Sequence, residues 1–512
     1  MIKKIKICGI KDPKDISVCN ELGIDFIGFN FADVSPRKIK PSYAKRKNLS
    51  SYCDEVERVA VFVDPSDYGV VSELYAWVAF LIVLLTFGME TAFFKFIQKE
   101  GAKEKTFATA LVSLLFINGL FFLIIALFHQ DLARLLLFEH HGEYILLLGA
   151  IVAIDAISSL PLAKLRAEEK ALRFSLIQFS SIGVNITLNL ILMLGFVSED
   201  NPERGIVFIL IANLIASLVK PLLLFKSFRL QSSFDSGLLK KMAFYSLPLA
   251  VAGFAGIINE TLDRILLKQI LYDPLIPSSL SYAEAQVGIY SACYKLAMLV
   301  TIFLQAYRYA AEPFFFSQMN KENKNQIYVK VMNAFIGLVC VVFLLVGLNI
   351  DIFKHFIQNE SYWIGLRVVP ILLLANVFLG IYYNQSIWYK LSGKTKFGAY
   401  IALSGAFMTV LINILFIPKY GFMACAWATL IVYLFQMLLS YFLGQKHYPI
   451  PYDLWKFFLY LGSALALYFF AIQVDFESFY MNLVFRNSLL LVFVISLFYF
   501  EKKKDTQENI KA

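Results

Sequence analysis

The residues of this chain most able to do chemistry are charged side chains set inside long apolar stretches. Lys220 in LVKPLL precedes a proline by one residue, and Arg367 in GLRVVP precedes one by three. A charge at the centre of a bilayer is costly, so such a side chain usually faces a cavity or a partner. Because Lys and Arg bind phosphate groups well, these two cations are the strongest candidates for holding an anionic ligand.

Carboxylates near cations form a second group of candidates. Glu90 in GMETAF either faces an internal cavity, as a polar or proton-linked contact, or bonds a neighbouring helix. Glu260 and Arg264 are four residues apart, so they share one helical face and can pair. We interpret them either as the outer mouth of a cavity or as a self-neutralised helix end. The candidate binding residues in the apolar part are Glu90, Lys220, Asn259, Glu260, Asp263, Arg264, Arg308, Glu312 and Arg367.

Other polar residues within apolar sequence have simpler explanations. Arg308 and Glu312 repeat the four-residue spacing and favour a salt bridge that braces a gate. Asp155 and Arg486 are weaker ligand candidates. Asparagines in such positions more often join helices than bind sugar; here they are Asn185, Asn189, Asn213, Asn376 and Asn413. The six cysteines show neither metal-ligand nor disulfide spacing, and there is no P-loop, so we expect no metal and no cofactor.

The elements that must position these residues are membrane helices. The chain has 512 residues, of which 59% are hydrophobic and 17% charged, whereas soluble proteins have about 25% charged residues. A helix needs about 20 apolar residues to cross the hydrocarbon core. Thirteen stretches satisfy this, at about 70–97, 106–128, 143–163, 171–196, 205–225, 243–262, 286–306, 328–349, 363–387, 396–417, 422–444, 455–473 and 480–500. The sequence therefore predicts an all-α polytopic membrane protein, and it argues against a soluble helical bundle, whose helices would carry polar stripes.

The net charge of +9 is explained by orientation rather than by nucleic-acid binding. Basic connectors such as KEGAKEK, KLRAEEKALR and KLSGKTK alternate with acidic or neutral ones such as VSEDNPER. Basic connectors stay in the cytoplasm, so we expect a cytoplasmic carboxyl terminus. The first span must then begin outside, which conflicts with a cytoplasmic start. We infer that a complete version has one further leading span, about fourteen in all.

Three segments of the membrane part resemble one family. DYGVVSELYAWVAFLIVLLTFGMETAFFKF (67–96), INETLDRILL (258–267) and AYRYAAEPFFF (306–316) resemble bacterial polysaccharide or lipid-linked oligosaccharide flippases, of the superfamily that includes MATE-type exporters. The resemblance covers about 66–500 and implies two pseudo-symmetric bundles of helices around a central cavity, with the first helix of a fourteen-helix fold missing. The implied activity is alternating-access transfer of a lipid-linked sugar across the bacterial inner membrane.

The resemblance also implies partners and alternatives. The partners would be the lipid-linked oligosaccharide, membrane lipids and other polysaccharide-assembly proteins, with no nucleic acid. The alternatives are a multidrug exporter of the same superfamily and an enzyme acting through the first part of the chain. A membrane-bound glycosyltransferase or polymerase is disfavoured because the sequence has no large catalytic loop outside the membrane. We expect 66–500 to form the transmembrane domain and 501–512 a charged cytoplasmic tail.

Residues 1–65 read as a fragment of another protein. IKICGI, DFIGFNF and VAVFV predict three parallel strands in a βαβαβ alternation. KICGI and SPR together resemble the start of phosphoribosylanthranilate isomerase, a (β/α)₈ barrel of tryptophan biosynthesis. The resemblance makes Cys8 the general base and Arg37 a substrate contact. Because the fragment stops after three strands, before the family's general acid and phosphate-binding loops, we expect no isomerase activity. VFVDPSDYG joins the two parts without a linker, which favours a chimera.

Overall fold

The computed structural model describes residues 6–8, 26–28, 57–58, 65–97, 103–138, 141–196, 204–228, 232–276, 278–318, 321–357, 359–392 and 394–511. Within these residues, 13 helices are long and apolar enough to cross a membrane, and each coincides with one of the predicted spans. Hydropathy thus located every span. Most of the helices extend beyond the predicted stretches at one or both ends, although Ala171–Phe196 matches its stretch and Arg204–Leu223 is slightly shorter.

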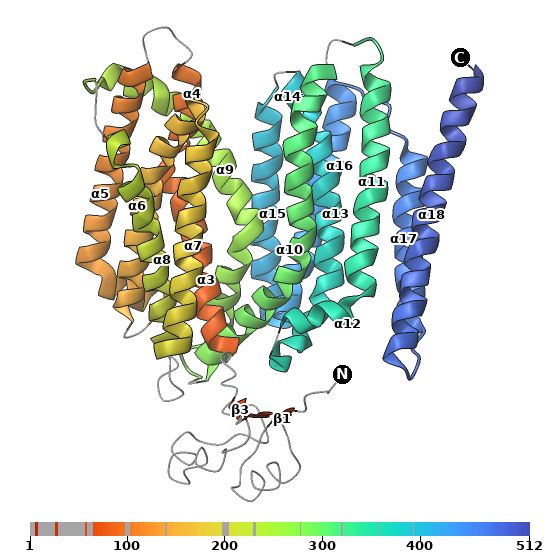
Figure 1. Ribbon diagram of the computed structural model, residues 1–512, viewed down its shortest axis with the longest axis horizontal. Helices are drawn as coiled ribbons and strands as arrows, with labels where there is room; N and C mark the ends of the chain where they lie inside the picture. The colour runs from red at the N-terminus through yellow and green to blue at the C-terminus, as the bar shows by residue number, and fades with distance from the viewer. Residues whose placement is uncertain are drawn as a thin grey trace, which may run out of the picture.

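The first helices form an amino-terminal bundle (Figure 1). Its members are α3 (Pro65–Thr86), α4 (Met89–Phe96), α5 (Lys103–Leu135), α6 (Gly142–Ala167), α7 (Ala171–Phe196) and α8 (Arg204–Leu223). The first predicted span is in fact two helices, since Phe87 and Gly88 have φ of 50° and 62°. This left-handed conformation breaks the helix, and only glycine adopts it without strain.

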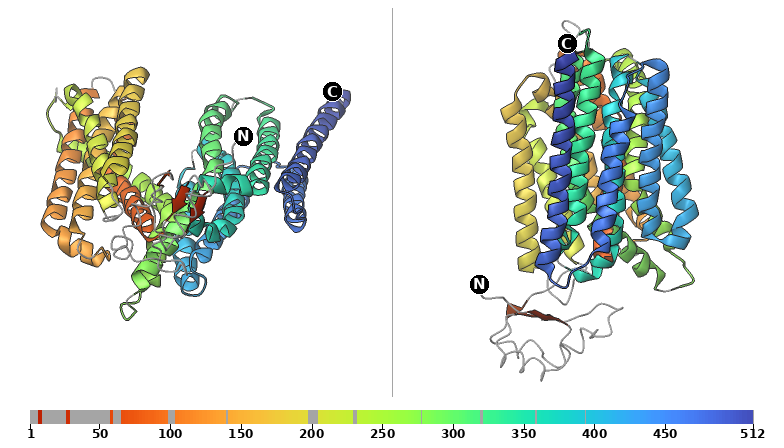
Figure 2. Two further views of the ribbon diagram at one scale, coloured as in Figure 1. Left: turned by 60° about the horizontal axis from the view of Figure 1, so that its bottom comes forward. Right: turned by 90° about the vertical axis from the view of Figure 1, so that its right-hand side faces the viewer.

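Helix α9 (Ser236–Leu271) follows the short η2 (Phe225–Phe228) and leads into the carboxyl-terminal bundle (Figure 1). The bundle contains α10 (Ser279–Gln318), α11 (Lys324–Leu348), α13 (Val369–Gln385), α15 (Lys396–Tyr420) and α16 (Phe422–His447). Short α12 (Ile350–Phe353), η3 (Lys354–Phe356), η4 (Glu360–Val368) and α14 (Ile387–Leu391) connect them. Helices α17 (Leu454–Gln473) and α18 (Phe479–Lys511) stand beside this bundle in two views (Figure 2).

Part of the predicted amino-terminal sheet is present. Strands β1 (Lys6–Cys8), β2 (Phe26–Gly28) and β3 (Glu57–Arg58) pair in parallel in the order β1-β2-β3. The parallel pairing of the first two strands confirms that part of the prediction. The third described strand, Glu57–Arg58, ends before the predicted VAVFV (59–63), which lies outside the described residues. Cys8 ends β1, as the barrel resemblance requires, but its side chain, the two intervening helical predictions and Arg37 lie outside the described residues.

The two bundles repeat one another in sequence as well as in packing. GVVSELY of α3 matches GIYSACY of α10, with Gly69, Ser72 and Tyr75 corresponding to Gly288, Ser291 and Tyr294. Ser180, Asn185 and Asn189 of α7 repeat the spacing of Ser404, Thr409 and Asn413 of α15. GIVFILIANLI, which opens α8, likewise matches GFMACAWATLI, which opens α16. Hydropathy had hidden this repeat, and it confirms the two pseudo-symmetric bundles.

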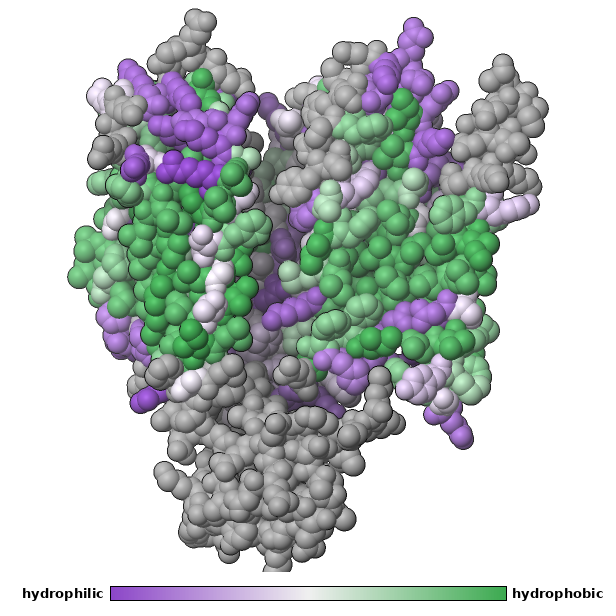
Figure 3. All heavy atoms as spheres, viewed as in Figure 1, coloured by the Kyte–Doolittle hydropathy of each residue, from purple (hydrophilic) through white to green (hydrophobic). Residues whose placement is uncertain are grey.

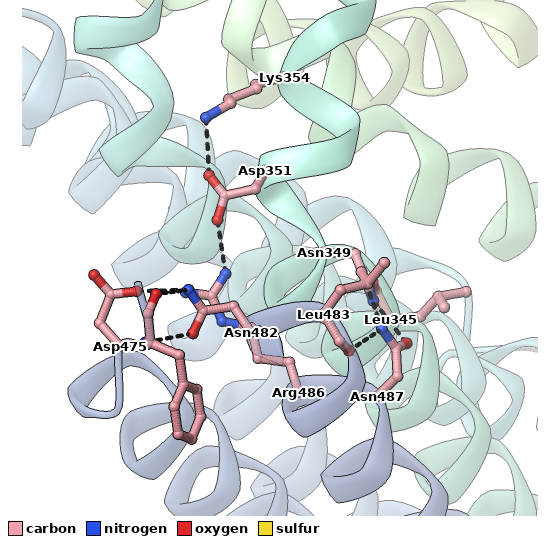
Figure 4. A network of polar contacts seen from close by, with 10 residues as sticks. Leu345, Asn349, Asp351, Lys354, Asp475, Asn482, Leu483, Arg486 and Asn487 are labelled. Carbon is pink, nitrogen blue, oxygen red and sulfur yellow. Dashed lines mark hydrogen bonds and ion pairs between the residues drawn. The ribbon is translucent and has the colours of Figure 1, made fainter. Parts of the chain in front are cut away.

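Polar contacts tie α18 to the carboxyl-terminal bundle (Figure 4). Asp351 of α12 accepts hydrogen bonds from Arg486 of α18 at 2.7 Å and from Lys354 at 2.9 Å. Asn349 and Asn487 exchange amide hydrogen bonds of 2.8 and 3.2 Å. Arg486 therefore holds a helix in place, which explains it better than ligand binding does.

Acid is expected to loosen this attachment. Burial alone would raise the pKa of Asp351, but hydrogen bonds from Lys354 and Arg486 outweigh it and hold the pKa below its ordinary value of 3.8. Ionised Asp351 therefore stabilises the contact above pH 3.8, and this stabilisation disappears as the pH falls through the lower folded-state pKa. We expect Asp351→Asn to abolish the acid-induced increase in hydrogen exchange of α18. An unchanged acid response in this variant would contradict the assignment.

Candidate functional site

The two bundles touch closely at one end of the molecule, where α3 meets α10. A Cβ added to Gly69 would overlap the carbonyl oxygen of Glu284, and one added to Gly288 would overlap the carbonyl oxygen of Pro65. The two contacts are equivalent under the internal repeat, because Pro65 and Glu284 each lie four residues before the corresponding glycine. Only glycine permits this backbone-to-backbone approach. The bundles are thus sealed together at this end.

A buried charged triad lies beside this seal. The Lys268 ammonium of α9 contacts Glu73 of α3 at 2.9 Å and Glu284 of α10 at 3.4 Å. The Lys268 and Glu73 side chains are 0% exposed, and that of Glu284 is 14% exposed. Buried charges are stable only when they are paired and hydrogen-bonded. The triad therefore links three helices from both bundles, and separating them would expose unpaired charge.

The rest of the Lys268 environment completes its pairing. Its ammonium donates to the carbonyl oxygens of Leu136 and Leu137, at 3.5 and 3.4 Å, and lies 3.7 Å from the Phe138 ring centroid. Lys268 was not among the predicted site residues, because a single charge in ILLKQI does not interrupt an apolar stretch. A search for intramembrane charges of opposite sign would have found Glu73, Lys268 and Glu284 as candidates.

At the opposite end the bundles diverge. Figure 1 shows them separating toward the end that carries α4 and α14, and Figure 3 shows a furrow between them with hydrophilic surface inside and apolar surface on the outer faces. Helices α9 and α10 of the carboxyl-terminal side pack against α3, so they border this furrow. The arrangement is sealed at one end and open at the other.

The predicted cluster on α9 is present, but its pairing differs from the prediction. Arg264 contacts the Asp263 carboxylate at 3.5 Å and donates at 2.9 Å to the backbone carbonyl of Glu260, rather than to its side chain. The helix-end interpretation is also wrong, because α9 continues to Leu271. Asp263 turns away from solvent and accepts a 2.6 Å hydrogen bond from Tyr290. The predicted side-chain pair does not form because Arg264 instead binds the adjacent Asp263 carboxylate and the backbone carbonyl of Glu260, while the Glu260 side chain is exposed.

Aromatic rings hold the cations of this region. Arg264 lies 4.5 Å from the ring centroid of Tyr294, and Arg308 lies 5.3 Å from that of Tyr383. Tyr383 interacts electrostatically with both Arg308 and the exposed Glu260. The structure thus brings Glu260, Arg264 and Arg308 to one region of the carboxyl-terminal bundle. The Glu312 side chain lies outside the described residues, so its pairing with Arg308 stays a prediction.

The remaining predicted residues lie elsewhere. Asn259 joins α9 to α15, donating to the carbonyl of Ala402 at 3.4 Å and accepting from Thr409 at 2.9 Å. Lys220 pairs with Asp155 at 2.9 Å within the amino-terminal bundle. Arg367 is exposed in η4 and lies 5.3 Å from the Phe422 ring centroid. Lys220 and Arg367, the two favoured ligand cations, are therefore not brought together.

Most of the asparagines join helices, as expected. Asn185 donates to Asn213 at 2.8 Å between α7 and α8, and Asn376 donates to the carbonyl of Ala297 at 3.2 Å between α13 and α10. Asn189 and Asn413 bond within their own helices, to the carbonyls of Asn185 and Thr409.

Glu90 lies in the first turn of α4, after the break, and pairs with Arg166 of α6 at 2.5 Å. This contact supports the helix-bonding interpretation. The two side chains are 37% and 41% exposed, so solvent screens their attraction. We expect Arg166→Ala to change the free energy of unfolding by no more than about 1 kcal/mol. Thermal unfolding in detergent measures this change in free energy. A larger loss of stability in both Arg166→Ala and Glu90→Gln would contradict the interpretation of the pair as an exposed, weakly stabilising contact.

Residues 58–319 match the family described as "Polysaccharide biosynthesis protein". The chain belongs to this family. The match covers α3 to α10 and so includes the seal, the triad and the α9 cluster.

Solved structures share the fold. An inward-facing MATE family multidrug resistance transporter of the MOP superfamily superposes with a TM-score of 0.56 at 15% identity, over 75% of this chain and 90% of its own. The lipid II flippase MurJ in an inward closed conformation superposes with a TM-score of 0.54 at 18% identity, over 85% of this chain and 97% of its own. At such low identities the likeness is one of fold.

The beginning of the chain is similar to N-(5'-phosphoribosyl)anthranilate isomerases. That of Leptospira interrogans is 56% identical over 43 residues, 8% of this chain and 20% of the enzyme. That of a Nitratiruptor species is 35% identical over 100 residues, 19% of this chain and 49% of the enzyme. The chain therefore spans between about a fifth and a half of these relatives.

Proposed function

We propose that this protein is a transporter that moves a lipid-linked oligosaccharide across a bacterial inner membrane by alternating access. The observation that carries the proposal is a furrow sealed at one end by the Gly69–Gly288 approach and open at the other. Membership of the polysaccharide biosynthesis family favours a glycan-bearing substrate. Flipping needs no covalent chemistry, and accordingly we assign no catalytic residue to the membrane part.

In place of Lys220 and Arg367, we propose Arg264 and Arg308 as the cations that bind the substrate. Arg264 and Arg308 lie on the helices that border the furrow. Arg308 contacts the Tyr383 ring with the face of its guanidinium group, which leaves the in-plane donors for a second partner. Arg264 already uses one nitrogen on Asp263 and on the Glu260 carbonyl, so only its other nitrogens are left to donate to a ligand. A diphosphate linked to lipid carries concentrated negative charge, which guanidinium groups bind through paired hydrogen bonds. We assign the diphosphate to Arg308 and Arg264, with the exposed Glu260 contacting sugar hydroxyls.

A multidrug exporter is the second candidate, favoured by the fold shared with MATE transporters. The two candidates differ in substrate charge, since an exporter of organic cations needs anionic contacts whereas a diphosphate needs cationic ones. Binding of an organic cation that competes with a lipid diphosphate at micromolar concentration would favour the exporter.

Orientation follows from the connectors. The basic connectors between α6 and α7 and between α14 and α15 lie at the open end of the furrow (Figure 1). By the positive-inside rule, the open end faces the cytoplasm, the sealed end faces outward and the carboxyl terminus is cytoplasmic.

We further propose that residues 1–65 are catalytically inert and that the transmembrane domain functions without them. The described strands make a sheet of three, and an eight-stranded barrel cannot close from these. Conversion of phosphoribosylanthranilate by the purified chain, at a rate above that of Cys8→Ala, would refute this.

Arg308→Ala is expected to reduce glycan export in a flippase-deficient strain by about tenfold or more, because one charged hydrogen-bonding partner contributes about 1.5–3 kcal/mol. Arg134→Ala is the matched control, since Arg134 forms an exposed pair with Asp131. Lys220→Ala should retain export if Lys220 acts only within its own bundle. Normal export by Arg308→Ala, at normal membrane levels, would remove Arg308 from the mechanism.

A further inference from the structure

The carboxyl-terminal bundle has a cavity of about 370 Å³ between α11, α13, α16 and α17. We call it the α17 groove; its lining begins at Met332 on α11 and ends at Phe458 on α17. Helix α17 packs chiefly on α11 and α18, so it stands off from α13 and α16 and leaves this space (Figure 2). The groove is separate from the furrow, because no described residue of α3, α9 or α10 lines it. Its volume is typical of small-molecule pockets, which measure about 300–1,000 Å³.

The outer wall of the α17 groove is apolar and faces lipid. Phe442 of α16 and Phe458 of α17 line it and are 65% and 66% exposed. Leu438 and Leu454 line it as well and are also exposed. In a membrane, apolar side chains on the outside of a helix bundle contact acyl chains. The groove therefore opens sideways into the hydrocarbon, and its occupant must be apolar over part of its length.

The inner wall of the groove is polar and incompletely paired. Asn333 of α11 and Gln385 of α13 line it and are 4% and 5% exposed. The Gln385 Oε1 atom is buried without a hydrogen-bond partner, and Asn333 makes no side-chain hydrogen bond within the part of the chain that the structure describes. Buried amides without partners are costly and rare in folded proteins. Both amides are thus available to a ligand that supplies donors or acceptors at this depth.

Asp453, just before α17, is the only charged residue among the described residues that line the groove. Its side chain accepts a 3.1 Å hydrogen bond from the Lys456 backbone N–H and so caps α17. A carboxylate offers about four acceptor positions, so Asp453 can accept from a ligand while it holds the cap. One carboxylate without a cation in the lining favours a headgroup that carries a positive charge, and it disfavours one that is only anionic.

These polar groups lie near one surface of the membrane. Gln385 lies at the end of the predicted span 363–387, and Asp453 lies at the start of the predicted span 455–473. The connector before Asp453 follows the basic last turn of α16, which contains Lys446 and His447. The positive-inside rule places this connector in the cytoplasm. The polar end of the groove therefore lies at the level of the headgroups of the cytoplasmic leaflet.

We propose that the α17 groove binds one phosphatidylethanolamine molecule of the cytoplasmic leaflet. Its primary ammonium donates to Asp453, and the amides of Asn333 and Gln385 hydrogen-bond its phosphate and ester oxygens. One acyl chain lies along Phe442 and Phe458. A choline headgroup has no N–H to donate, and phosphatidylglycerol would bring a net negative charge to Asp453. The bound lipid fills the space between α17 and the bundle, and it is distinct from any transported substrate.

Native mass spectrometry of the delipidated full chain in detergent tests the proposal. The probes are phospholipids with identical oleoyl chains, whose headgroups are ethanolamine, N,N-dimethylethanolamine, choline and glycerol. We expect the ethanolamine lipid to bind about tenfold more tightly than the choline lipid, as one charged hydrogen bond would give. The dimethyl lipid keeps one N–H and should bind nearly as well as the ethanolamine lipid, whereas the glycerol lipid should bind no better than the choline lipid. Transport is not measured, so a failure here leaves the proposed function untouched.

Asp453→Asn should remove the preference for ethanolamine over choline, because asparagine keeps the cap of α17 but not the charge. Asp235→Asn is the matched control, since Asp235 caps α9 by accepting from the Leu238 backbone N–H at 2.9 Å and does not line the groove. The proposal would be overturned if the unaltered chain bound the choline or glycerol lipid as tightly as the ethanolamine lipid, or if Asp453→Asn kept the preference. Displacement of the ethanolamine lipid by micromolar dodecyltrimethylammonium would also overturn it, because the groove would then be a site for organic cations.

Discussion

Lys268→Ala is expected to lower the free energy of unfolding by about 3–5 kcal/mol and to open the sealed end of the furrow. The substitution leaves the buried Glu73 carboxylate and the nearly buried Glu284 carboxylate without their cation. Two like charges in one dry site repel each other and cannot be hydrated without separating α3 from α10. Thermal unfolding in detergent measures the loss, and reactivity of a cysteine at Tyr68 measures the opening.

Two further variants separate the effect of unpaired charge on stability from the effect of lost packing. Arg134→Ala removes one member of an exposed pair and should cost at most about 1 kcal/mol. The triple change Glu73→Gln, Lys268→Met and Glu284→Gln removes every charge of the triad, and it should recover most of the stability lost in Lys268→Ala. If Lys268→Ala unfolds no earlier than Arg134→Ala, the triad does not hold the bundles together.

Gly288→Leu is expected to prevent closure of the sealed end, at a cost of about 1–3 kcal/mol to the state described. Any Cβ at this position overlaps the Pro65 carbonyl oxygen, which belongs to the backbone and cannot rotate aside. The helices must then move apart by about 1–2 Å or more. Spin labels at the exposed Leu135 and Phe356, one at the end of each bundle, measure this separation.

Gly69→Leu should give the same widening, because the repeat makes the two contacts equivalent. Gly183→Ala and Gly256→Ala are the controls, since a Cβ at either position meets nothing within 4 Å. An unchanged label separation in both leucine variants would show that the close approach of α3 and α10 does not set the distance between the bundles.

Hydropathy predicted the membrane helices well because crossing lipid imposes a length and a composition that each segment must satisfy alone. The break at Phe87 and Gly88 escaped notice because a backbone turn within an apolar stretch leaves hydropathy unchanged. The candidate site was predicted less well, since its contacts join residues distant in sequence. Lys268 binds carboxylates that belong to two other helices, and Asp263 of α9 accepts a hydrogen bond from Tyr290 of α10.

Lys220 also shows the difference between what a local sequence signal and a tertiary contact reveal. Its position in an apolar stretch correctly indicated a partner, but that partner is Asp155 of a neighbouring helix. A charge inside the membrane thus predicts that some interaction exists, whereas only the tertiary arrangement shows whether a ligand or another helix supplies it.

Transfer of a fluorescent undecaprenyl-diphosphate oligosaccharide between the leaflets of proteoliposomes tests the central claim most directly. The reporter is the fraction of fluorophore that an added membrane-impermeant quencher can reach over time. We expect the full chain to accelerate transfer above protein-free vesicles and Gly288→Leu, reconstituted at equal density, not to do so. Transfer by Gly288→Leu at the rate of the unaltered chain, or an unaltered chain no faster than empty vesicles, would contradict it.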